Sequence, residues 1–231
     1  MLAAGLDIRR NKEVVSVKVD AGGVCVDCID GEVAAGSHAI VTVPLGVLKQ
    51  GVPRFDPPLP APVREAIDAI GFGRYEKIAL RFESAFWRDL GLSHFIVFPA
   101  DEHEPSMWVF DLDAFGAGPV LCAHLFHTIT PYALDRPPAQ AAEWMSGVLV
   151  DVFGREVPEP VAAVVMSWAT DPLAGGSYSY CPQGAEPWML DLLGEPVSGR
   201  LLLAGEHTQS ARGGYADGAY VSGLRAAEWL V

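Results

Sequence analysis

The alternation of apolar and polar residues near the start of the chain predicts β-structure. Two runs of β-branched residues, at 14–19 and 24–29, flank the turn sequence Asp20-Ala21-Gly22-Gly23, and this pattern is typical of a β-hairpin. Residues 39–43 are continuously apolar or β-branched and end at Pro44, which predicts a strand buried on both faces. Together these segments favour a layered α/β fold.

The next segment carries too many prolines for a regular element. Five prolines lie between residues 51 and 62, and proline removes a backbone donor and disrupts helices and central strands. We therefore expect a crossing between two structural units here, with a domain boundary. Beyond it, Val63, Ala66, Ile67 and Ile70 follow the spacing of a helix, which ends at the following glycine, residue 71.

Strand and helix periods alternate through the rest of the chain. Every second residue is apolar over 77–82, which predicts a strand with one buried face. We expect Ile78, Leu80 and Phe82 on that face, with Lys77, Ala79 and Arg81 opposite. Further strands are predicted at 95–98, 107–110, 120–126, 161–168 and 201–204. Helices are predicted at 139–153 and 216–230, the first with a buried stripe of Met145, Val148, Leu149, Val152 and Phe153.

Composition narrows the class of protein. The chain has 231 residues, 50% hydrophobic and 19% charged, a balance that supports a folded core and excludes disorder and fibres. No apolar run approaches the roughly 18 residues that a membrane-spanning helix needs. The formal net charge of −13 repels phosphate backbones and anionic headgroups, so neither a nucleic acid nor a membrane is an expected partner. The first residues do not resemble a signal peptide, which makes a cytoplasmic location the expectation.

The cysteines and histidines do not predict a metal site. The four cysteines are scattered, so no disulfide framework is needed. Cys25 and Cys28 have the spacing of half a zinc site, but they lie in a predicted strand, where positions three apart point to opposite faces. The same parity argument applies to His124 and His127. We therefore expect no bound metal.

Two places carry residues suited to chemistry. Residues 205–208, Gly-Glu-His-Thr, follow the last predicted strand, and two glycines precede the last helix, a turn that can present backbone N–H groups to an electron-rich ligand. Residues 175–180 form a loop rich in glycine and tyrosine, and such loops often carry function. Tyr178, Tyr180 and Tyr215 could equally be packing aromatics, and Lys77 a solvated strand end or a partner for a neighbouring glutamate. Composition and spacing therefore leave the function open.

A series of motifs in a fixed order runs along nearly the whole chain. They are HAIVTVPLGVLK at 38–49, FDPPLP at 55–60, GFG at 71–73 ahead of Lys77, Phe86-Trp87, Trp168, Asp171-Pro172, GSYSY at 176–180, LAGEHT at 203–208, GAY at 218–220 and SGLRAA at 222–227. This series resembles the flavin-dependent amine oxidases, most closely the branch of polyamine oxidases and histone lysine demethylases.

The resemblance implies a two-lobed α/β fold, with a mixed sheet and helices in the substrate lobe. Residues 1–50 and 198–231 would belong to the lobe that binds FAD, and residues 51–197 to the lobe that binds substrate. It also implies oxidation of a C–N bond in a primary or secondary amine or a polyamine. Hydride would pass to FAD, the imine would hydrolyse, and oxygen would reoxidise the flavin to give hydrogen peroxide.

The resemblance assigns roles to individual residues. Lys77 matches the lysine that holds a water at the flavin edge, where arriving hydride leaves negative charge. Tyr178 and Tyr215 match the two rings that sandwich the amine, whose nitrogen is attracted by aromatic faces. The implied cofactor contacts are Trp168 near the flavin ring, Glu206 at the sugar, Val14 toward the adenine, Tyr215 and Ala216 at the start of the last helix, and Pro44.

Three departures from the family pattern stand out. No G-x-G-x-x-G turn for the FAD pyrophosphate occurs in the sequence, so we expect the isolated chain to be colourless or to hold FAD weakly, and to oxidise amines slowly or not at all. Asp217 stands where many relatives carry His or Glu. No single basic residue is assigned to hold a carboxylate, which an L-amino-acid oxidase would need, since Arg74, Arg81 and Arg212 all remain open.

The missing turn leaves several interpretations open. The chain could be a shortened reading frame, one subunit of a split oxidase whose second chain carries the G-x-G-x-x-G half, or a relic that binds something else. A non-catalytic interaction module that keeps the fold without flavin is the alternative outside the enzymes. A yellow colour on purification would separate the two classes.

Overall fold

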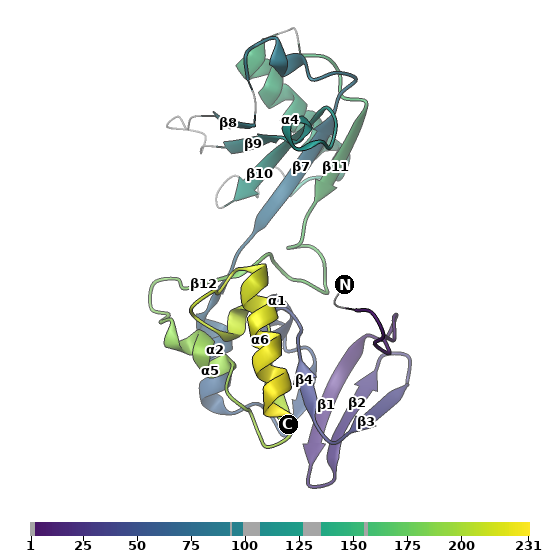
Figure 1. Cartoon of the computed structure of the whole chain (residues 1–231), viewed down its shortest axis with the longest axis vertical. Coiled ribbons are helices and arrows are strands. Elements are labelled where there is room, and N and C mark those ends of the chain that lie inside the picture. Colours follow the sequence, from purple (N-terminus) through teal and green to yellow (C-terminus); the bar gives the residue numbers. More distant parts are fainter. Residues whose placement is uncertain (1–2, 93, 99–106, 127–134, 155–156) are drawn as a thin grey trace. The chain divides into compact units, whose positions relative to one another are not determined.

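Two compact units make up the chain in this computed structural model (Figure 1). The structure describes residues 1–231 except 1–2, 93, 99–106, 127–134 and 155–156. The first unit combines Met1–Phe72 with Tyr178–Val231, and the second is Gly73–Ser177. His127, one of the two histidines weighed as metal ligands, lies outside the described residues.

The sheet at the start of the first unit contains the predicted hairpin. Strands β1 and β2 pair antiparallel, with an irregularity in register between Val14 and Ser16. An unpredicted third strand, β3, extends the hairpin, and β5 pairs parallel to β1 on the other side. The sheet therefore has the order β3-β2-β1-β5, with bounds Val33–Gly36, Gly23–Cys28, Val14–Asp20 and Arg54–Asp56.

Two short strand pairs and four helices complete the first unit. β4 (Ala39–Val41) pairs parallel to β13 (Leu201–Leu203), and β6 (Gly71–Phe72) pairs antiparallel to β12 (Ser179–Tyr180). The helices are α1 (Leu45–Lys49), α2 (Ala61–Ala69), α5 (Trp188–Leu193) and α6 (Ala216–Trp229), with a 3-10 turn at Glu206–Thr208.

The proline-rich segment lies within the first compact unit, although the sequence predicts a domain boundary there. The helix α2 begins at Ala61, and Pro62 fits its first turn because the N–H groups there have no intrahelical partner. The helix buries Val63, Ala66 and Ile67 in the core of this unit, and β5 joins its sheet. The compact units divide at 72/73 and 177/178, and the lobe boundaries at 50/51 and 197/198 stay predictions. The roles assigned to the two lobes stay predictions.

The segment at 39–43 is less buried than predicted. β4 ends at Val41, which is buried, whereas Ala39 and Ile40 are only half-buried. Within the described part of the chain β4 pairs with β13 alone, so this parallel sheet has two strands. Ala39 packs against the main core of the first unit and Ile40 against Leu202 and Ala204, so both faces of the strand are partly covered.

The second unit is an antiparallel sheet of five strands in the order β11-β7-β10-β9-β8. Their bounds are Ala162–Met166, Tyr75–Arg81, Val120–Phe126, Met107–Asp111 and Phe95–Phe98. Short 3-10 turns lie at Phe86–Arg88 and Leu112–Phe115. One face of the sheet packs against α4 (Pro138–Phe153).

The alternation predicted for residues 77–82 is confirmed, because Ile78, Leu80 and Phe82 are all buried in the core beneath α4. In α4 the buried residues are Ala141, Met145 and Leu149. These follow every fourth position, so Val152 lies to one side of the contact row. Val152 is 49% exposed, and its predicted place in the stripe is wrong. No helix within the described ranges is both long and apolar enough to cross a membrane.

Candidate active site

The turn between β13 and α6 is built around a carboxylate, Glu206. The strand ends in three buried leucines, and Gly205 follows with a φ of +154°. A side chain at this glycine would approach the His207 ring within 2.6 Å, so the chain can turn sharply only because residue 205 has no Cβ. Glu206 therefore lies just beyond the carboxyl end of the strand, at the start of the 3-10 turn.

Glu206 accepts three hydrogen bonds from two separate segments. Its Oε1 accepts from the backbone N–H of Ser179 at 3.1 Å, and its Oε2 accepts from the Ser179 hydroxyl at 2.6 Å. The backbone N–H of Gly214 also donates to Oε2, at 2.6 Å. A carboxylate accepts up to about four hydrogen bonds, so Oε1 keeps acceptor capacity for one further donor.

The two predicted substrate rings flank this carboxylate in the sequence and in the fold. Tyr178 precedes Ser179, Tyr215 follows Gly214, and both rings are exposed, at 39% and 60%. Burial, and secondarily the nearby Tyr215, raise the pKa of the Tyr178 phenol. The phenol therefore stays neutral at ordinary pH. The first unit thus brings together three of the predicted site residues, Tyr178, Tyr215 and Glu206.

The start of α6 carries a charged pair beside Tyr215. The Arg212 guanidinium lies 4.8 Å from the centroid of the Tyr215 ring, within the range of a cation–π contact. Its Nε donates to the Asp217 carboxylate at 2.9 Å, and this contact lowers the pKa of Asp217. Asp217, the unusual residue at this position, therefore neutralises an arginine over the ring. Ala216, the predicted cofactor contact, is the exposed first residue of the helix.

Buried and half-buried polar groups hold the turn between β13 and α6 in place. Arg225 of α6 donates to the carbonyl oxygen of Thr208 at 2.8 Å and to its hydroxyl at 3.0 Å. Burial lowers the pKa of His207 to about 4, so its imidazole is neutral at pH 7. The strand, the 3-10 turn and α6 are therefore held as one piece.

Lys77 lies on an aromatic face of the second unit. It projects from β7 opposite His124 of β10 and Met166 of β11, on the side of the sheet away from α4. Its Nζ is 5.8 Å from the centroid of the Tyr75 ring, and no carboxylate among the described residues forms an ion pair with it. A role as ion-pair partner of a neighbouring glutamate is therefore not what the structure shows.

The side chains around Lys77 make a neutral, ring-lined surface. Tyr75 stacks on Phe126 at 5.7 Å, and the Tyr75 hydroxyl shares a hydrogen bond of 2.7 Å with His124 Nδ1. Burial, and then the charge of Lys77, lower the pKa of His124 to about 4. Phe110 lies 4.3 Å from the His124 ring. Lys77 is thus a cation whose immediate neighbours are uncharged, with Arg81 farther along the same face of β7, and this face can attract electron-rich or anionic groups.

A second carboxylate, Glu76, holds Trp168. Glu76 is fully buried, and its two oxygens accept from the backbone N–H groups of Trp168 at 2.7 Å and Ala169 at 3.0 Å. The Trp168 side chain is 48% exposed. The second unit therefore brings the segment of Trp168 next to β7, one residue from Lys77.

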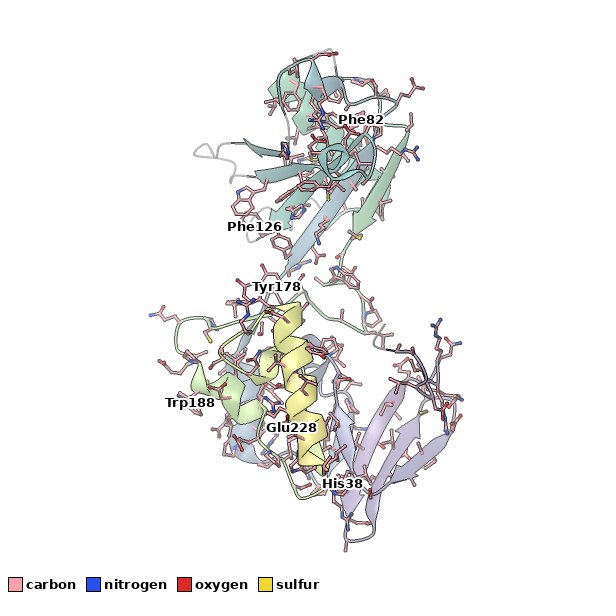
Figure 2. The ribbon with its side chains drawn as sticks, viewed as in Figure 1. His38, Phe82, Phe126, Tyr178, Trp188 and Glu228 are labelled. Atoms are coloured by element: carbon pink, nitrogen blue, oxygen red, sulfur yellow. The ribbon has the colours of Figure 1, made fainter. Side chains whose placement is uncertain are left out.

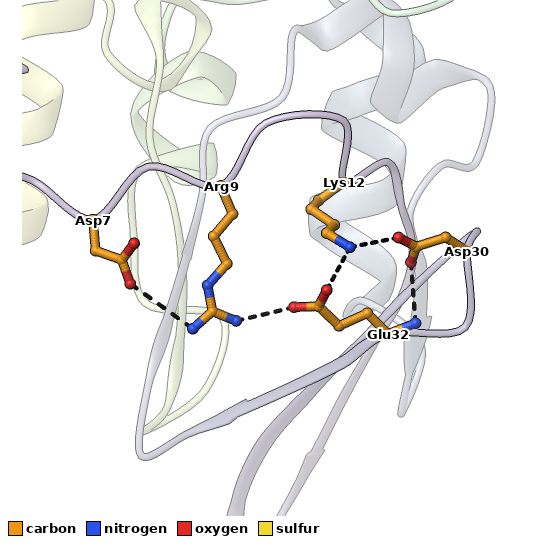
Figure 3. Close-up of polar contacts among 5 residues, drawn as sticks. All are labelled: Asp7, Arg9, Lys12, Asp30 and Glu32. Carbon is orange, nitrogen blue, oxygen red and sulfur yellow. Dashed lines mark hydrogen bonds and ion pairs between the residues drawn. The ribbon is translucent and has the colours of Figure 1, made fainter.

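Val14 and Pro44 lie in the first unit, but on different elements from Tyr178, Glu206 and Tyr215. Val14 is the half-buried first residue of β1, and Pro44 precedes α1. The segment before Val14 is tied to the turn between β2 and β3 by ion pairs: Lys12 with Asp30 and Glu32, and Arg9 with Glu32 at 3.0 Å (Figure 3). The cofactor roles of Val14 and Pro44 stay predictions.

The residues present fit one end of FAD. The backbone N–H groups of the exposed residues Ala216 and Asp217, at the start of α6, suit the electron-rich edge of a flavin ring, and the spare acceptor on Glu206 suits a sugar hydroxyl. No residue pattern in the chain suits the pyrophosphate, because the sequence has no G-x-G-x-x-G turn. The site is therefore a helix terminus with two aromatic walls, suited to a flat electron-rich ligand and a small cation.

Comparison with known proteins identifies the family. The family model described as "Flavin containing amine oxidoreductase" matches residues 1–231. The chain belongs to this family of flavin-containing amine oxidoreductases.

Two relatives and one solved structure show how far the similarity extends. Lysine-specific histone demethylase 1 homolog 2 of Arabidopsis thaliana is 34% identical over 256 aligned positions, covering 100% of this chain and 31% of that protein. Lysine-specific histone demethylase 1B of Mus musculus is 31% identical, covering 98% and 28%. The solved structure of cyclohexylamine oxidase from Brevibacterium oxydans IH-35A has a TM-score of 0.74 at 21% identity, covering 94% of this chain and 48% of that one. The chain spans about a third of the length of the two relatives.

These comparisons confirm the predicted family and the mixed α/β fold of part of an FAD-dependent amine oxidase. They do not bear on the individual site residues, whose roles stay predictions. Sequence reasoning missed Glu76 as a structural partner of Trp168, and Ser179 and Gly214 as partners of Glu206. The only signal for the last two was their position beside the predicted tyrosines.

Proposed function

We propose that this chain forms the amine-binding and flavin-contacting part of an oxidase that cleaves a C–N bond of a primary or secondary amine or a polyamine. The observation that supports the proposal is that Ser179 and Gly214, the neighbours of Tyr178 and Tyr215, both donate to one carboxylate, Glu206. Two exposed rings at a helix N-terminus provide both a surface for a small cation and donors for a flavin edge. FAD, when bound, supplies the hydride acceptor and the reaction with oxygen that gives hydrogen peroxide.

The chain's own residues bind and orient the substrate. The neutral rings of Tyr178 and Tyr215 attract the amine nitrogen and limit the directions that the C–H bond beside it can take, which is how positioning lowers a barrier. Lys77, by the resemblance, holds a water near the flavin edge. Its neutral surroundings support that role, because no described carboxylate competes for its charge.

The charged groups favour a simple amine over an L-amino acid. Of the three arginines considered for a substrate carboxylate, Arg74 pairs with Asp135 at 3.6 Å, and Arg81 lies at the far end of β7 from Tyr75. Arg212 is beside Tyr215, but its guanidinium already binds Asp217. A substrate carboxylate would have to displace that carboxylate, whereas an amine would not.

The test is anaerobic reduction of bound flavin by a panel of candidate substrates. The protein is prepared with FAD and, in parallel, together with a separately expressed G-x-G-x-x-G half from a relative, since we propose that the pyrophosphate is bound by residues other than these 231. The panel contains a diamine, a triamine, benzylamine, a methyl-lysine peptide and L-amino acids. Bleaching of the flavin by amines and not by amino acids supports the proposal. Stoichiometric flavin that no amine reduces would contradict the proposed activity, and failure of both preparations to hold flavin would favour the non-catalytic interaction module.

A further inference from the structure

One carboxylate joins the two segments that carry the proposed substrate rings. Ser179 and Glu206 are 27 positions apart, and Gly214 lies 8 positions beyond Glu206. The three donors nevertheless converge on the Glu206 oxygens, two of them at 2.6 Å. Bonds of this length to an ionised acceptor are the strong class of hydrogen bond.

These bonds restrain the tyrosine backbones directly. The N–H of Ser179 belongs to the same peptide plane as the carbonyl of Tyr178, so fixing one fixes the other. Gly214 immediately precedes Tyr215, and the N–H of Tyr215 donates in turn to the Arg212 carbonyl at 3.3 Å. The hydrogen bonds to Glu206 therefore fix the backbone beside each tyrosine, and with it the direction of each Cα–Cβ bond.

The two segments also touch each other at Gly214. This glycine has a φ of +79°, and a Cβ built there would lie 3.4 Å from the Ser179 carbonyl oxygen and 3.6 Å from Cδ2 of Tyr178. The left-handed backbone favours glycine. The two distances are ordinary van der Waals separations, so the segment of Tyr178 lies beside the backbone that carries Tyr215. The effect of Tyr215 on the pKa of Tyr178 agrees with this closeness.

A glutamate suits this position better than its amide. An ionised carboxylate only accepts hydrogen bonds, and all three groups that face it are donors. In Glu206→Gln, one of the two terminal atoms becomes an NH₂ group. Whichever way the amide is turned, a backbone N–H of Ser179 or of Gly214 then faces another donor.

We propose that Glu206 is a positioning residue that fixes the spacing between Tyr178 and Tyr215, and with it the width of the amine site. The statement about the amine rests on the proposed function. The statement about the spacing of the rings stands independently, because it depends on contacts within the first unit alone.

The experiment uses the whole chain labelled with 3-fluorotyrosine. The sequence has six tyrosines, so single Tyr→Phe variants assign the fluorine resonances of residues 178 and 215. The variants are Glu206→Gln and Ser179→Ala, and the matched control is Glu228→Gln, an exposed glutamate near the end of α6 (Figure 2). Tetramethylammonium chloride is the cation probe, and its affinity is measured well below each melting temperature.

In the parent we expect both resonances to shift together and saturably with the probe. Glu206→Gln should move both resonances before any probe is added and weaken probe binding about tenfold. Ser179→Ala removes one donor and keeps the N–H, so it should weaken binding about threefold, and Glu228→Gln should change nothing. A merely structural glutamate would lower the melting temperature without changing the affinity of the folded protein.

The outcomes test separately whether Glu206 fixes the spacing of the rings and whether the rings form an amine site. Parent-like resonances and affinity in Glu206→Gln overturn the proposal, even if amines reduce the flavin. Resonances that move in Glu206→Gln while the parent does not bind the probe support the positioning and remove the amine site. If Glu206→Gln unfolds the first unit, Ser179→Ala decides: shifted resonances support the proposal and unchanged ones overturn it.

Discussion

Replacing Glu76 by glutamine should destabilise the second unit. The Glu76 carboxylate is fully buried and accepts from two backbone N–H groups, at 2.7 and 3.0 Å. A glutamine keeps one acceptor oxygen, so one of these N–H groups would face an NH₂ group. The loss of one hydrogen bond to a charged acceptor costs ~1.5–3 kcal/mol. Because the Trp168 side chain is half exposed, water can reach part of this region, and we expect ~1–2 kcal/mol for Glu76→Gln.

Hydrogen exchange measures this effect where it arises. The bonds of Glu76 join β7 to the segment that follows β11, so the amides of residues 168 and 169 and of β11 should exchange about five- to thirtyfold faster in the variant. Urea unfolding followed by circular dichroism gives the corresponding loss of free energy. Glu83→Gln is the matched control, since Glu83 is an exposed glutamate just beyond β7.

The reasoning is refuted if Glu76→Gln exchanges and unfolds like Glu83→Gln. In that case the two short contacts would contribute nothing that a neutral amide could not replace, and Trp168 would be held by its own packing. A faster exchange spread over both units would also count against it, because the hydrogen bonds from Trp168 and Ala169 to Glu76 lie within the second unit.

Four further predictions concern other residues of the two units. Lys77→Met in an FAD-loaded assembly should leave flavin bound and slow flavin reduction or reoxidation about ten- to a thousandfold, ~1.4–4 kcal/mol at the barrier; unchanged stopped-flow rates in both half-reactions would remove it from the site. Tyr178→Ala or Tyr215→Ala should lower kcat/KM for amines about ten- to a thousandfold with little change in melting temperature, and the Phe variants should lose much less; unfolding of the Ala variants would make the rings core residues. The folded pKa of His207 is about 4 against 6.5, so the unfolded state binds more protons between these values, and the first unit should lose stability as pH falls through that window; a flat urea-unfolding profile across it would contradict this. Lys12→Met should change the melting temperature very little at high salt, because its ion pairs are exposed and screened; a large loss would show that the ion pairs matter.

Local periodicity predicted the regular elements well. The hairpin at β1 and β2, the strand β7 and the helix α6 each follow a period that a single segment reveals. The errors occurred where the answer depended on distant partners. Residues 51–62 look like a linker by their prolines, but β5 is recruited by β1, some forty positions earlier.

The candidate site was predicted from family motifs and could not be predicted from the local sequence around its residues. Tyr178 and Tyr215 were predicted because they match positions in a known family, and nothing in their local sequence separates them from packing aromatics. Their common partner Glu206 was predicted too, but with a role at the cofactor sugar. That it also binds Ser179 and Gly214 depends on the pairing of β12 with β6 and on the turn after β13, which no short window of sequence contains.

Both units use the same physical device beside a predicted site residue. Glu76 holds the backbone at Trp168 from 92 positions away, and Glu206 holds the backbones next to Tyr178 and Tyr215. In each case the carboxylate binds main-chain N–H groups, which every residue except proline possesses, and leaves the aromatic side chains exposed. The fold therefore constrains the backbone positions that carry the rings and does not constrain which side chains occupy them. A substitution at Tyr178 or Tyr215 should alter the site while the turn keeps its shape, whereas a substitution at Glu206 should displace both positions together.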